Sequence, residues 1–317
     1  MKVAVLRGGR SGEHDVSLVS GDAVASGLAE AGHEVVKITI GRDGRWVDES
    51  GNGFDLRPAG GLLDCDVVFP ALHGPYGEDG VVQGMLEVLD VPYVGSSVLA
   101  SATAIDKLGC KRLLGWYGMA QADFVGVGED GWREKALSMT RPLWVKPSRL
   151  GSSVGISRVD DPEDGSVLDD AVALALDHDP RVIIEAHVEG RELEVGILEL
   201  EDGDLLATPP GELIIHADWY DYAAKYEEGG MELAVPAPVG DDVIAAAGEL
   251  AKRVFRAVGA SGLARCDLFL SPEGELLVNE INTMPGFTPT SVYARLVEAA
   301  GIPYPELCDR LVRLATR

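Results

Sequence analysis

Two short segments near the C-terminus carry side chains suited to binding a divalent cation. Arg265 and Asp267 are separated by one residue, and so are Glu280 and Asn282. Side chains two residues apart on a strand share a face, so two adjacent strands would present two carboxylates, an amide and a guanidinium on one surface. Such oxygens suit Mg²⁺, which completes its shell with phosphate oxygens and water.

A surface ion pair between Arg265 and a neighbouring acid is the alternative interpretation of the same residues. The segment that follows, residues 283–288, reads TMPGFT and contains adjacent proline and glycine residues. Proline restricts the backbone φ angle and glycine permits angles that other residues avoid, so the pair would fix a turn beside the ligands. This turn favours the metal site over the surface pair.

A second candidate is Lys146 with the glycine- and serine-rich residues 147–155 that follow it. A lysine at a strand end next to such a loop supplies a point charge and backbone N–H groups, which together can cradle phosphate oxygens. A flexible hairpin tip is the alternative. The formal net charge of the chain is −25, so a lysine inside this motif is informative and favours phosphate contact.

A third segment, residues 73–84, reads HGPYGEDGVVQG and follows an apolar run. Its glycines allow close approach of the backbone to a ligand, and α/β proteins bind ligands at the C-terminal ends of strands. His73 could equally be a core histidine, and Glu78 and Asp79 could simply interact with a helix dipole. The P-loop motif, the G-x-G-x-x-G spacing, H-E-x-x-H and G-x-S-x-G are all missing.

The elements that must position these residues follow two different patterns. The first hundred residues alternate apolar runs with helical periodicity, which predicts a parallel sheet covered by helices on both faces. The chain then predicts two helices, an antiparallel hairpin around the glycine-rich loop and two late strands beside each other. The expected strands are 2–6, 33–40, 67–72, 92–94, 143–147, 154–159, 181–188, 192–201, 205–208, 264–270 and 275–281, and the expected helices are 16–31, 81–89, 98–105, 107–117, 167–177 and 242–258.

Composition limits the function classes. A chain of 317 residues with 46% hydrophobic residues is long enough for two or three packed domains. The charge of −25 argues against a nucleic-acid partner, because binding a phosphate backbone requires clustered lysine and arginine. Four scattered cysteines indicate reduced thiols, and the lack of a long apolar run predicts no membrane span and a cytoplasmic protein.

Five motifs occur in order along the chain, at residues 8–17 (GGRSGEHDVS), 73–84, 146–155, 220–226 (YDYAAKY) and 279–286 (NEINTMPG). With these motifs the chain resembles the D-alanine–D-alanine ligases of the ATP-grasp superfamily over its whole length. The resemblance implies an α/β and α+β fold of three domains, with an N-terminal parallel α/β domain. The domains would span residues 1–96, 97–183 and 184–317, with a lid loop at about 209–234.

The resemblance also implies roles for individual residues. The residues that would contact ATP are Lys107, Lys146, Glu185, Val188 and Glu192, and those that would hold two Mg²⁺ ions, or Mn²⁺ in their place, are Asp267, Glu280 and Asn282. The residues implied for substrate binding are His73, Ser291 and Lys225, and those implied for catalysis are Glu13, Ser152, Tyr226, Arg265 and Gly286. The sequence leaves open which group deprotonates the second substrate.

The reaction implied by the resemblance is ATP-dependent joining of two D-alanine molecules through D-alanyl phosphate, for peptidoglycan synthesis. D-Serine or D-lactate as second substrate is the nearest alternative, and Tyr226 favours dipeptide formation over D-lactate. Broader alternatives are an ATP-grasp ligase for another carboxylate and a nucleotide-binding regulatory module that has lost catalysis. The resemblance suggests a homodimer formed through the N-terminal domain, without nucleic-acid or membrane partners.

Overall fold

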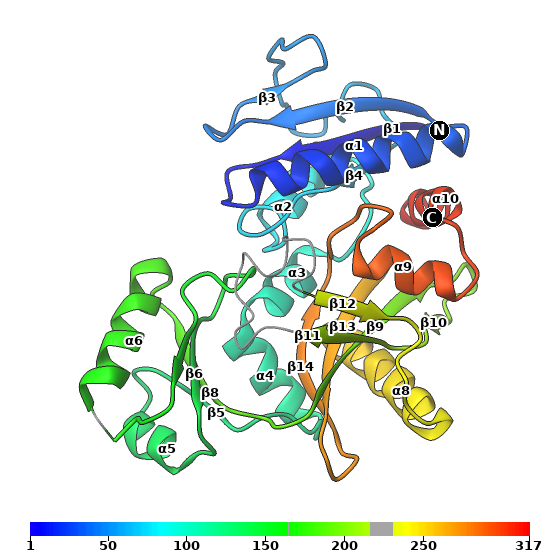
Figure 1. Cartoon of the computed structure of the whole chain (residues 1–317). Coiled ribbons are helices and arrows are strands. Elements are labelled where there is room, and N and C mark those ends of the chain that lie inside the picture. The colour runs from blue at the N-terminus through cyan, green and yellow to red at the C-terminus, as the bar shows by residue number, and fades with distance from the viewer. Residues whose placement is uncertain (164, 216–230) are drawn as a thin grey trace.

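In the computed structural model of this chain, which describes residues 1–163, 165–215 and 231–317, the described strands form three sheets (Figure 1). The first sheet has the strand order β3-β2-β1-β4. Its strand β1 pairs in parallel with β2 and β4, which confirms the predicted parallel sheet, whereas β3 is an antiparallel edge strand. These strands are β1 (Lys2–Gly8), β2 (Glu34–Ile40), β3 (Trp46–Val47) and β4 (Val67–Pro70).

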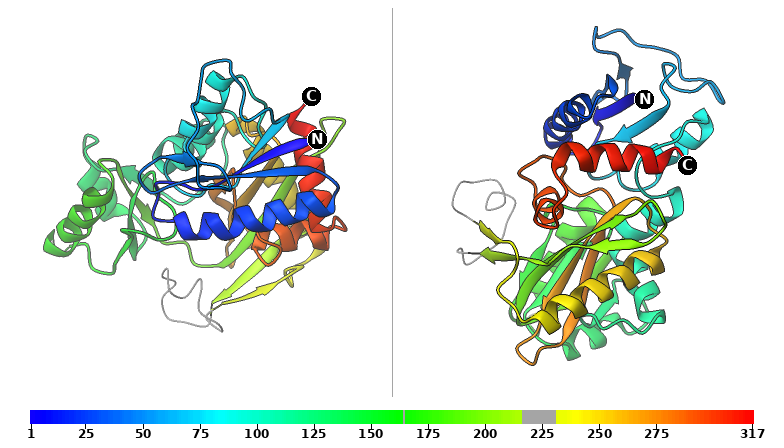
Figure 2. Two further views of the ribbon diagram at one scale, coloured as in Figure 1. Left: turned by 90° about the horizontal axis from the view of Figure 1, so that it is seen from above. Right: turned by 90° about the vertical axis from the view of Figure 1, so that its right-hand side faces the viewer.

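Helices cover both faces of this first sheet because alternate residues of β1 point to opposite sides. Val3 and Val5 pack in one core with α1 (His14–Glu30) and α10 (Tyr304–Ala315). Ala4 and Leu6 pack in another core with α2 (Val81–Leu89). Helix α10 thereby returns the chain to its start, and the two termini lie side by side in both views of Figure 2.

The second sheet is antiparallel, with the strand order β5-β8-β6-β7. Its strands are β5 (Phe124–Gly126), β6 (Leu143–Pro147), β7 (Ser157–Val159) and β8 (Val182–Ala186). Helices α5 (Trp132–Ser138) and α6 (Gly165–His178) complete its core. Strands β6 and β7 form the predicted hairpin, so the glycine-rich loop projects from one end of this sheet.

The third sheet contains six described strands, ordered β12-β11-β9-β13-β14 with β10 paired to β9. They are β9 (Arg191–Glu199), β10 (Leu205–Ala207), β11 (Gly211–Ile215), β12 (Met231–Ala234), β13 (Leu263–Leu270) and β14 (Leu276–Asn282). One face packs on α3 (Val98–Ile105), α4 (Lys107–Trp116) and α8 (Asp241–Val258), and the other packs on α9 (Val292–Ala299). Helices α3 and α4 precede the second sheet in sequence but bury their apolar side chains against the third.

Several elements differ from the sequence prediction. The expected strand at 92–94 is reduced to one parallel bridge between Val68 and Tyr93. Strand β7 begins only at Ser157, because residues 152–155 form a turn in which Ser152, Ser153 and Gly155 adopt positive φ angles that strands do not accommodate. The short elements β3, β5 and α5 were not predicted. Strands β11 and β12 pair with each other inside the predicted lid segment 209–234, and residues 216–230 between them lie outside the described part.

No helix within the described residues has the length and apolar character needed to cross a membrane.

Candidate active site

A cavity of about 1290 Å³ is lined by residues of the second and third sheets and, beside the first sheet, by residues of α1, the turn before it and the loop after β4. Every predicted site residue that the structure describes lines this cavity: Glu13, His73, Lys107, Lys146, Ser152, Glu185, Val188, Glu192, Arg265, Asp267, Glu280, Asn282, Gly286 and Ser291. Lys225 and Tyr226 belong to the predicted set but lie outside the described residues. The sequence-based residues therefore gather in one place, although they come from segments far apart in the chain.

The late strands β13 and β14 are antiparallel neighbours, and their register determines which side chains lie opposite each other. Asp267 lies opposite Glu280, and Arg265 lies opposite Asn282. Residues directly opposite each other in an antiparallel pair have their side chains on the same face of the sheet. The prediction that these strands are neighbours is confirmed.

Arg265 is held in this cavity by two carboxylates. Its Nε and Nη2 donate to the two oxygens of Asp267 at 2.7 Å each, and Nε also lies 3.2 Å from Glu194 Oε2. Burial opposes its charge, but Asp267 and Glu194 raise the pKa of Arg265 well above its ordinary value. The pair is mostly buried, with 17% of the Arg265 side chain exposed. Arg265 is thus a fixed cation inside the cavity, not part of a surface ion pair.

Lys107, at the first position of α4, connects this pair of strands to the glycine-rich loop. Its Nζ lies 3.0 Å from Glu280 Oε2 and donates to Leu150 O at 3.0 Å. The Lys107 ammonium lowers the pKa of Glu280 to about 2, and although burial opposes the charge on Lys107, Glu280 raises its pKa. Both groups are therefore ionised at neutral pH.

The chemistry of Asp267, Glu280 and Asn282 fits a bound Mg²⁺ ion. Two carboxyl groups and one amide oxygen lie on adjacent strands and line the same cavity. Within the part of the chain that the structure describes, no cluster of three or more His, Cys, Asp or Glu side chains could hold a metal. The rest of a Mg²⁺ shell at these three residues would accordingly come from phosphate oxygens and water.

A buried ion triad lies further along the cavity wall. Glu185 on β8 accepts from Lys146 Nζ at 2.5 Å and lies 2.8 Å from Lys111 Nζ. The side chains of Glu185 and Lys111 are only 5% and 4% exposed. Burial alone would raise the pKa of Glu185, but the two ammonium groups lower it far below its ordinary value. Lys146 is consequently fixed at the end of its strand, next to the glycine-rich loop.

Elsewhere on the cavity wall, Glu13 meets the glycine-rich loop. Ser152 Oγ donates to Glu13 Oε1 at 2.5 Å across 139 residues of sequence. Gly74 lies against the second oxygen, since a Cβ atom there would be only 2.5 Å from Glu13 Oε2, and its φ of +72° also favours glycine. The contact between Glu13 and Ser152 therefore brings the first sheet and the central hairpin together.

Glu78 is a second carboxyl group beside Glu13. It accepts from Gly74 N at 2.6 Å, and burial together with the charge of Glu13 raises its pKa to about 8. His73 is buried, its Nε2 lies 2.8 Å from Ser20 Oγ, and burial lowers its pKa. Glu78 is thus largely protonated and His73 neutral at neutral pH. Glu13 therefore lies beside a protonated carboxyl group and a neutral imidazole, which makes it the candidate partner for an ammonium group.

Gly286 and Ser291 also line the cavity. Ser291 precedes α9, and its Oγ accepts from Thr288 N at 3.0 Å. A Cβ atom at Gly286 would lie 3.4 Å from Ser291 Oγ, so the two residues are neighbours. Val188, within the β8–β9 connection, and Glu192, in β9, also line the cavity.

Sequence reasoning missed Lys111, Glu194 and the inward direction of Glu78. Asp79 does serve the start of α2, because its Oδ1 accepts from Val81 N at 3.1 Å, whereas Glu78 turns into the cavity. The alternation along β9 could have identified Glu194, which shares a strand face with Glu192. Nothing in the sequence around Lys111 distinguishes it from an exposed helix lysine.

Comparisons with known proteins give one consistent result. The family model described as D-ala D-ala ligase C-terminus matches residues 113–313, and the one described as D-ala D-ala ligase N-terminus matches residues 2–60 and 55–96. D-alanine–D-alanine ligase A of Mesorhizobium japonicum is 46% identical over 99% of this chain and 97% of the relative. The D-alanine–D-alanine ligase of Deinococcus radiodurans is 44% identical over 99% and 98%.

Solved structures agree with these sequences. The VanG D-Ala:D-Ser ligase from Enterococcus faecalis is similar with a TM-score of 0.88, 30% identity and coverage of 99% of both chains. The D-alanine-D-alanine ligase from Coxiella burnetii is similar with a TM-score of 0.86, 31% identity and coverage of 100% of this chain and 94% of that one. These likenesses confirm the predicted ATP-grasp fold.

Proposed function

We propose, from the premise that this chain belongs to the D-alanine–D-alanine ligase family and is an ATP-dependent ligase, that it joins two D-alanine molecules for peptidoglycan synthesis. The observation that carries this proposal is the composition of one cavity. Two carboxylates, an amide and two cations, Arg265 and Lys107, line it together with the Glu13–Ser152 pair. A nucleotide and a small amino acid can therefore bind in the same enclosed space.

In this proposal ATP lies along the wall formed by Lys107, Lys146, Glu185, Val188 and Glu192. Asp267, Glu280 and Asn282 would hold two Mg²⁺ ions, for which Mn²⁺ could substitute. A divalent cation bound there would supply positive charge against the phosphate oxygens. The domains would span residues 1–96, 97–183 and 184–317, and the predicted lid at 209–234 would carry Lys225 and Tyr226 over the site.

The first substrate would bind with its ammonium group at Glu13 and its carboxylate near His73. That carboxylate attacks the γ-phosphorus of ATP, which forms D-alanyl phosphate and releases ADP. The amine of the second D-alanine, oriented through its carboxylate by Ser291, then loses a proton and attacks the carbonyl carbon. Arg265 and the Gly286 N–H would stabilise the resulting oxyanion before inorganic phosphate leaves. Exclusion of water protects the acyl phosphate from hydrolysis.

We expect ADP release to depend on D-alanine and to exceed release with D-lactate by at least about 10-fold at neutral pH, because a site that orients an amine leaves polar groups unpaired with a hydroxy acid. The measurement is an ADP-release assay with D-alanine alone and paired with D-serine or D-lactate. Since VanG is a D-Ala:D-Ser ligase, D-serine is the main competitor. Activity only when D-lactate is supplied as the second substrate would exclude dipeptide formation. No ADP release with any of these substrates would favour a regulatory module.

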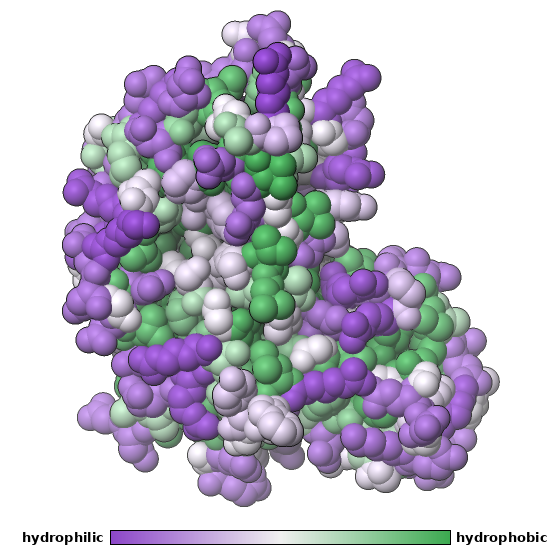
Figure 3. Space-filling model, turned by 180° about the vertical axis from the view of Figure 1, so that it is seen from behind, coloured by the Kyte–Doolittle hydropathy of each residue, from purple (hydrophilic) through white to green (hydrophobic). Residues whose placement is uncertain are grey.

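The proposal also includes a homodimer and a cytoplasmic location, where reduced thiols would match the four free cysteines. The surface proposed for the partner copy is the outward face of α2, where Val81, Met85 and Val88 are 56%, 41% and 55% exposed. Their spacing places them on one side of the helix. Helices α2 and α3 lie toward the rear of the molecule (Figure 2), and the rear face has a column of hydrophobic residues near its middle (Figure 3).

The change of Met85 and Val88 to glutamate is expected to convert a dimer into a monomer, since buried, unpaired carboxylates strongly oppose association. We expect the dissociation constant to rise by at least about 100-fold, measured by light scattering after gel filtration over a range of concentrations. Leu174→Glu on α6, where Leu174 is 45% exposed, is the matched control and should leave the dimer intact. A wild-type protein that stays monomeric at tens of micromolar would contradict this surface.

A further inference from the structure

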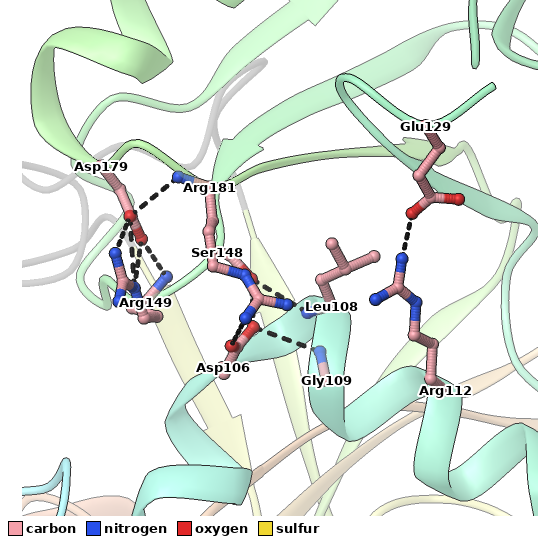
Figure 4. Close-up of polar contacts among 9 residues, drawn as sticks. All are labelled: Asp106, Leu108, Gly109, Arg112, Glu129, Ser148, Arg149, Asp179 and Arg181. Atoms are coloured by element: carbon pink, nitrogen blue, oxygen red, sulfur yellow. Dashed lines mark hydrogen bonds and ion pairs between the residues drawn. The ribbon is translucent and has the colours of Figure 1, made fainter. Parts of the chain in front are cut away.

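A group of polar residues lies behind the cavity wall, where the start of α4, the end of β6 and the start of β8 meet (Figure 4). We call it the polar joint, and it consists of Asp106, Ser148, Arg149, Asp179 and Arg181. Ser148 and Asp179 are buried but are not among the residues that line the cavity. The family resemblance and the proposed reaction assign them no role.

The first half of the joint fixes Lys107. Ser148 Oγ donates to Asp106 Oδ1 at 2.6 Å and accepts from Leu108 N at 3.0 Å. Asp106 also caps α4 by accepting from Gly109 N at 3.1 Å, and Lys107 N donates to Ser148 O at 2.8 Å. Arg181 Nη1 lies 3.0 Å from the other oxygen of Asp106. The first turn of α4 is therefore tied to the end of β6 by side-chain and backbone bonds together.

The second half of the joint fixes the beginning of the glycine-rich loop. Asp179 accepts from Arg149 N at 2.8 Å, from Arg149 Nη2 at 2.6 Å and from Arg181 N at 3.0 Å. The Asp179 side chain is 4% exposed. Burial opposes its charge, but the hydrogen bonds from Arg149 and Arg181 lower its pKa, and Asp179 raises the pKa of Arg149. Arg149 is thus held by its backbone and its guanidinium at once.

The loop that follows needs such an anchor. Ser152 and Ser153 have φ angles of +54° and +58°, which residues other than glycine rarely adopt. Strained backbone of this kind persists only where its surroundings determine it. In this conformation the loop brings Ser152 to Glu13 and places Leu150 O where Lys107 Nζ donates to it. The loop and Lys107, both proposed to contact ATP, thereby share one support.

We propose that Asp179, together with Ser148, is a positioning residue that sets the glycine-rich loop and Lys107 in the geometry required for ATP and for the contact of Ser152 with Glu13. The inference rests on the proposed function, because the importance of the loop depends on ATP and the amino acid binding beside it. Asp179 acts through Arg149 and Ser148 acts through Asp106, so neither residue touches a substrate.

The test is the Asp179→Asn variant. A carboxamide accepts hydrogen bonds only through its oxygen, and its NH₂ group would face one of the N–H donors of Arg149. The loop would therefore lose its anchor. We expect kcat/KM for ATP to fall on the order of 100-fold, since a displacement of about 1 Å can have that effect. Ser152→Ala should lower the activity of the wild type but have little further effect in Asp179→Asn, because Ser152 is then already displaced. A purely structural loss of stability would leave the two effects multiplicative.

A milder variant guards against failure of Asp179→Asn to fold. Arg149→Gln removes the guanidinium but keeps the backbone N–H bonded to Asp179, and we expect about a 10-fold loss in kcat/KM for ATP, with Arg149→Lys in between. The matched control is Arg112→Gln, which removes an exposed pair between Arg112 on α4 and Glu129 in the turn after β5 (Figure 4) and should change kcat/KM by less than about twofold.

Calorimetric binding of a non-hydrolysable ATP analogue separates the joint from the proposed reaction. Weaker binding by folded Asp179→Asn and Arg149→Gln supports the joint even if the wild type shows no ligase activity, in which case the proposed function alone fails. The inference would be overturned if both folded variants bound the ATP analogue with dissociation constants within twofold of wild type. It would also be overturned if the losses in kcat/KM caused by Asp179→Asn and Ser152→Ala were fully multiplicative.

Discussion

Arg265→Lys is expected to lower kcat by about 1000-fold at saturating ATP and D-alanine. The guanidinium binds both oxygens of Asp267 through a fork at 2.7 Å and also contacts Glu194, and an ammonium cannot reproduce that planar geometry. If Arg265 also donates to the developing oxyanion, its replacement removes a donor of the kind typically worth about 3–4 kcal/mol. Initial-rate measurements of ADP and phosphate release give kcat and both KM values.

A matched control exists in the same sheet. Arg191 on β9 forms a comparable fork with Glu212, at 2.6 and 2.7 Å, but does not line the cavity. Arg191→Lys should change kcat by less than about threefold, because a partly exposed pair contributes little. Because lysine keeps the positive charge, Arg265→Lys should still fold, as near-wild-type thermal unfolding would show. A folded Arg265→Lys enzyme with more than a tenth of wild-type kcat would remove Arg265 from the catalytic set.

The sequence predicts most of the metal-type site because its geometry is local. The alternation of β13 and β14 already places Arg265 with Asp267, and Glu280 with Asn282, and only the pairing of the two strands had to be supplied by the fold. The same holds for the parallel first sheet, whose apolar runs and intervening helices have clear periodicity. Short elements such as β3 have no such pattern, since two residues cannot show a period.

The contacts that join distant segments could not be predicted in the same way. Glu13 and Ser152 are 139 residues apart, and their pairing depends on how the central hairpin lies against the first sheet. Asp179 lies between α6 and β8, where an aspartate looks like an ordinary loop residue. Its burial under Arg149 is visible only once β6 and β8 are paired.

Lys111 is a further example, and it changes the interpretation of Glu185. The resemblance implied only contact of Glu185 with the nucleotide, but the structure places this carboxylate between the ammonium groups of Lys111 and Lys146. The periodicity of the helix places Lys111 on a face with both polar and apolar residues. It therefore gives no indication that Lys111 pairs with Glu185, 74 residues later. Glu185 therefore supports the fold of the central region in addition to any contact with ATP.

Glu185→Gln is accordingly expected to destabilise the protein by about 3–5 kcal/mol, because two buried or partly buried ammonium groups would lose their shared counter-ion. With an unfolding entropy of about 2.1 cal/mol/K per residue, this corresponds to a decrease in Tm of roughly 4–8 °C for a chain of 317 residues, measured by calorimetry. Lys146 would also lose its fixed position, so the KM for ATP should rise. The control is Glu163→Gln, which breaks an exposed pair with Arg141 at 2.8 Å and should change stability by less than about 0.5 kcal/mol.

The stability contributed by the Glu185 charge should change with pH in a defined direction. The two lysines depress the pKa of Glu185 in the folded state below its unfolded value of about 4.3. The stabilisation by its charge is therefore complete above about pH 5 and declines as the pH falls below the unfolded pKa, where only the unfolded chain takes up the proton. The difference in Tm between wild type and Glu185→Gln should be constant from pH 6 to 8 and become smaller near pH 3.5. A loss of unfolding free energy below about 1 kcal/mol at pH 7 in Glu185→Gln would mean that Glu185 is not the counter-ion that holds this region together. A difference in stability that grows as the pH falls would mean the same.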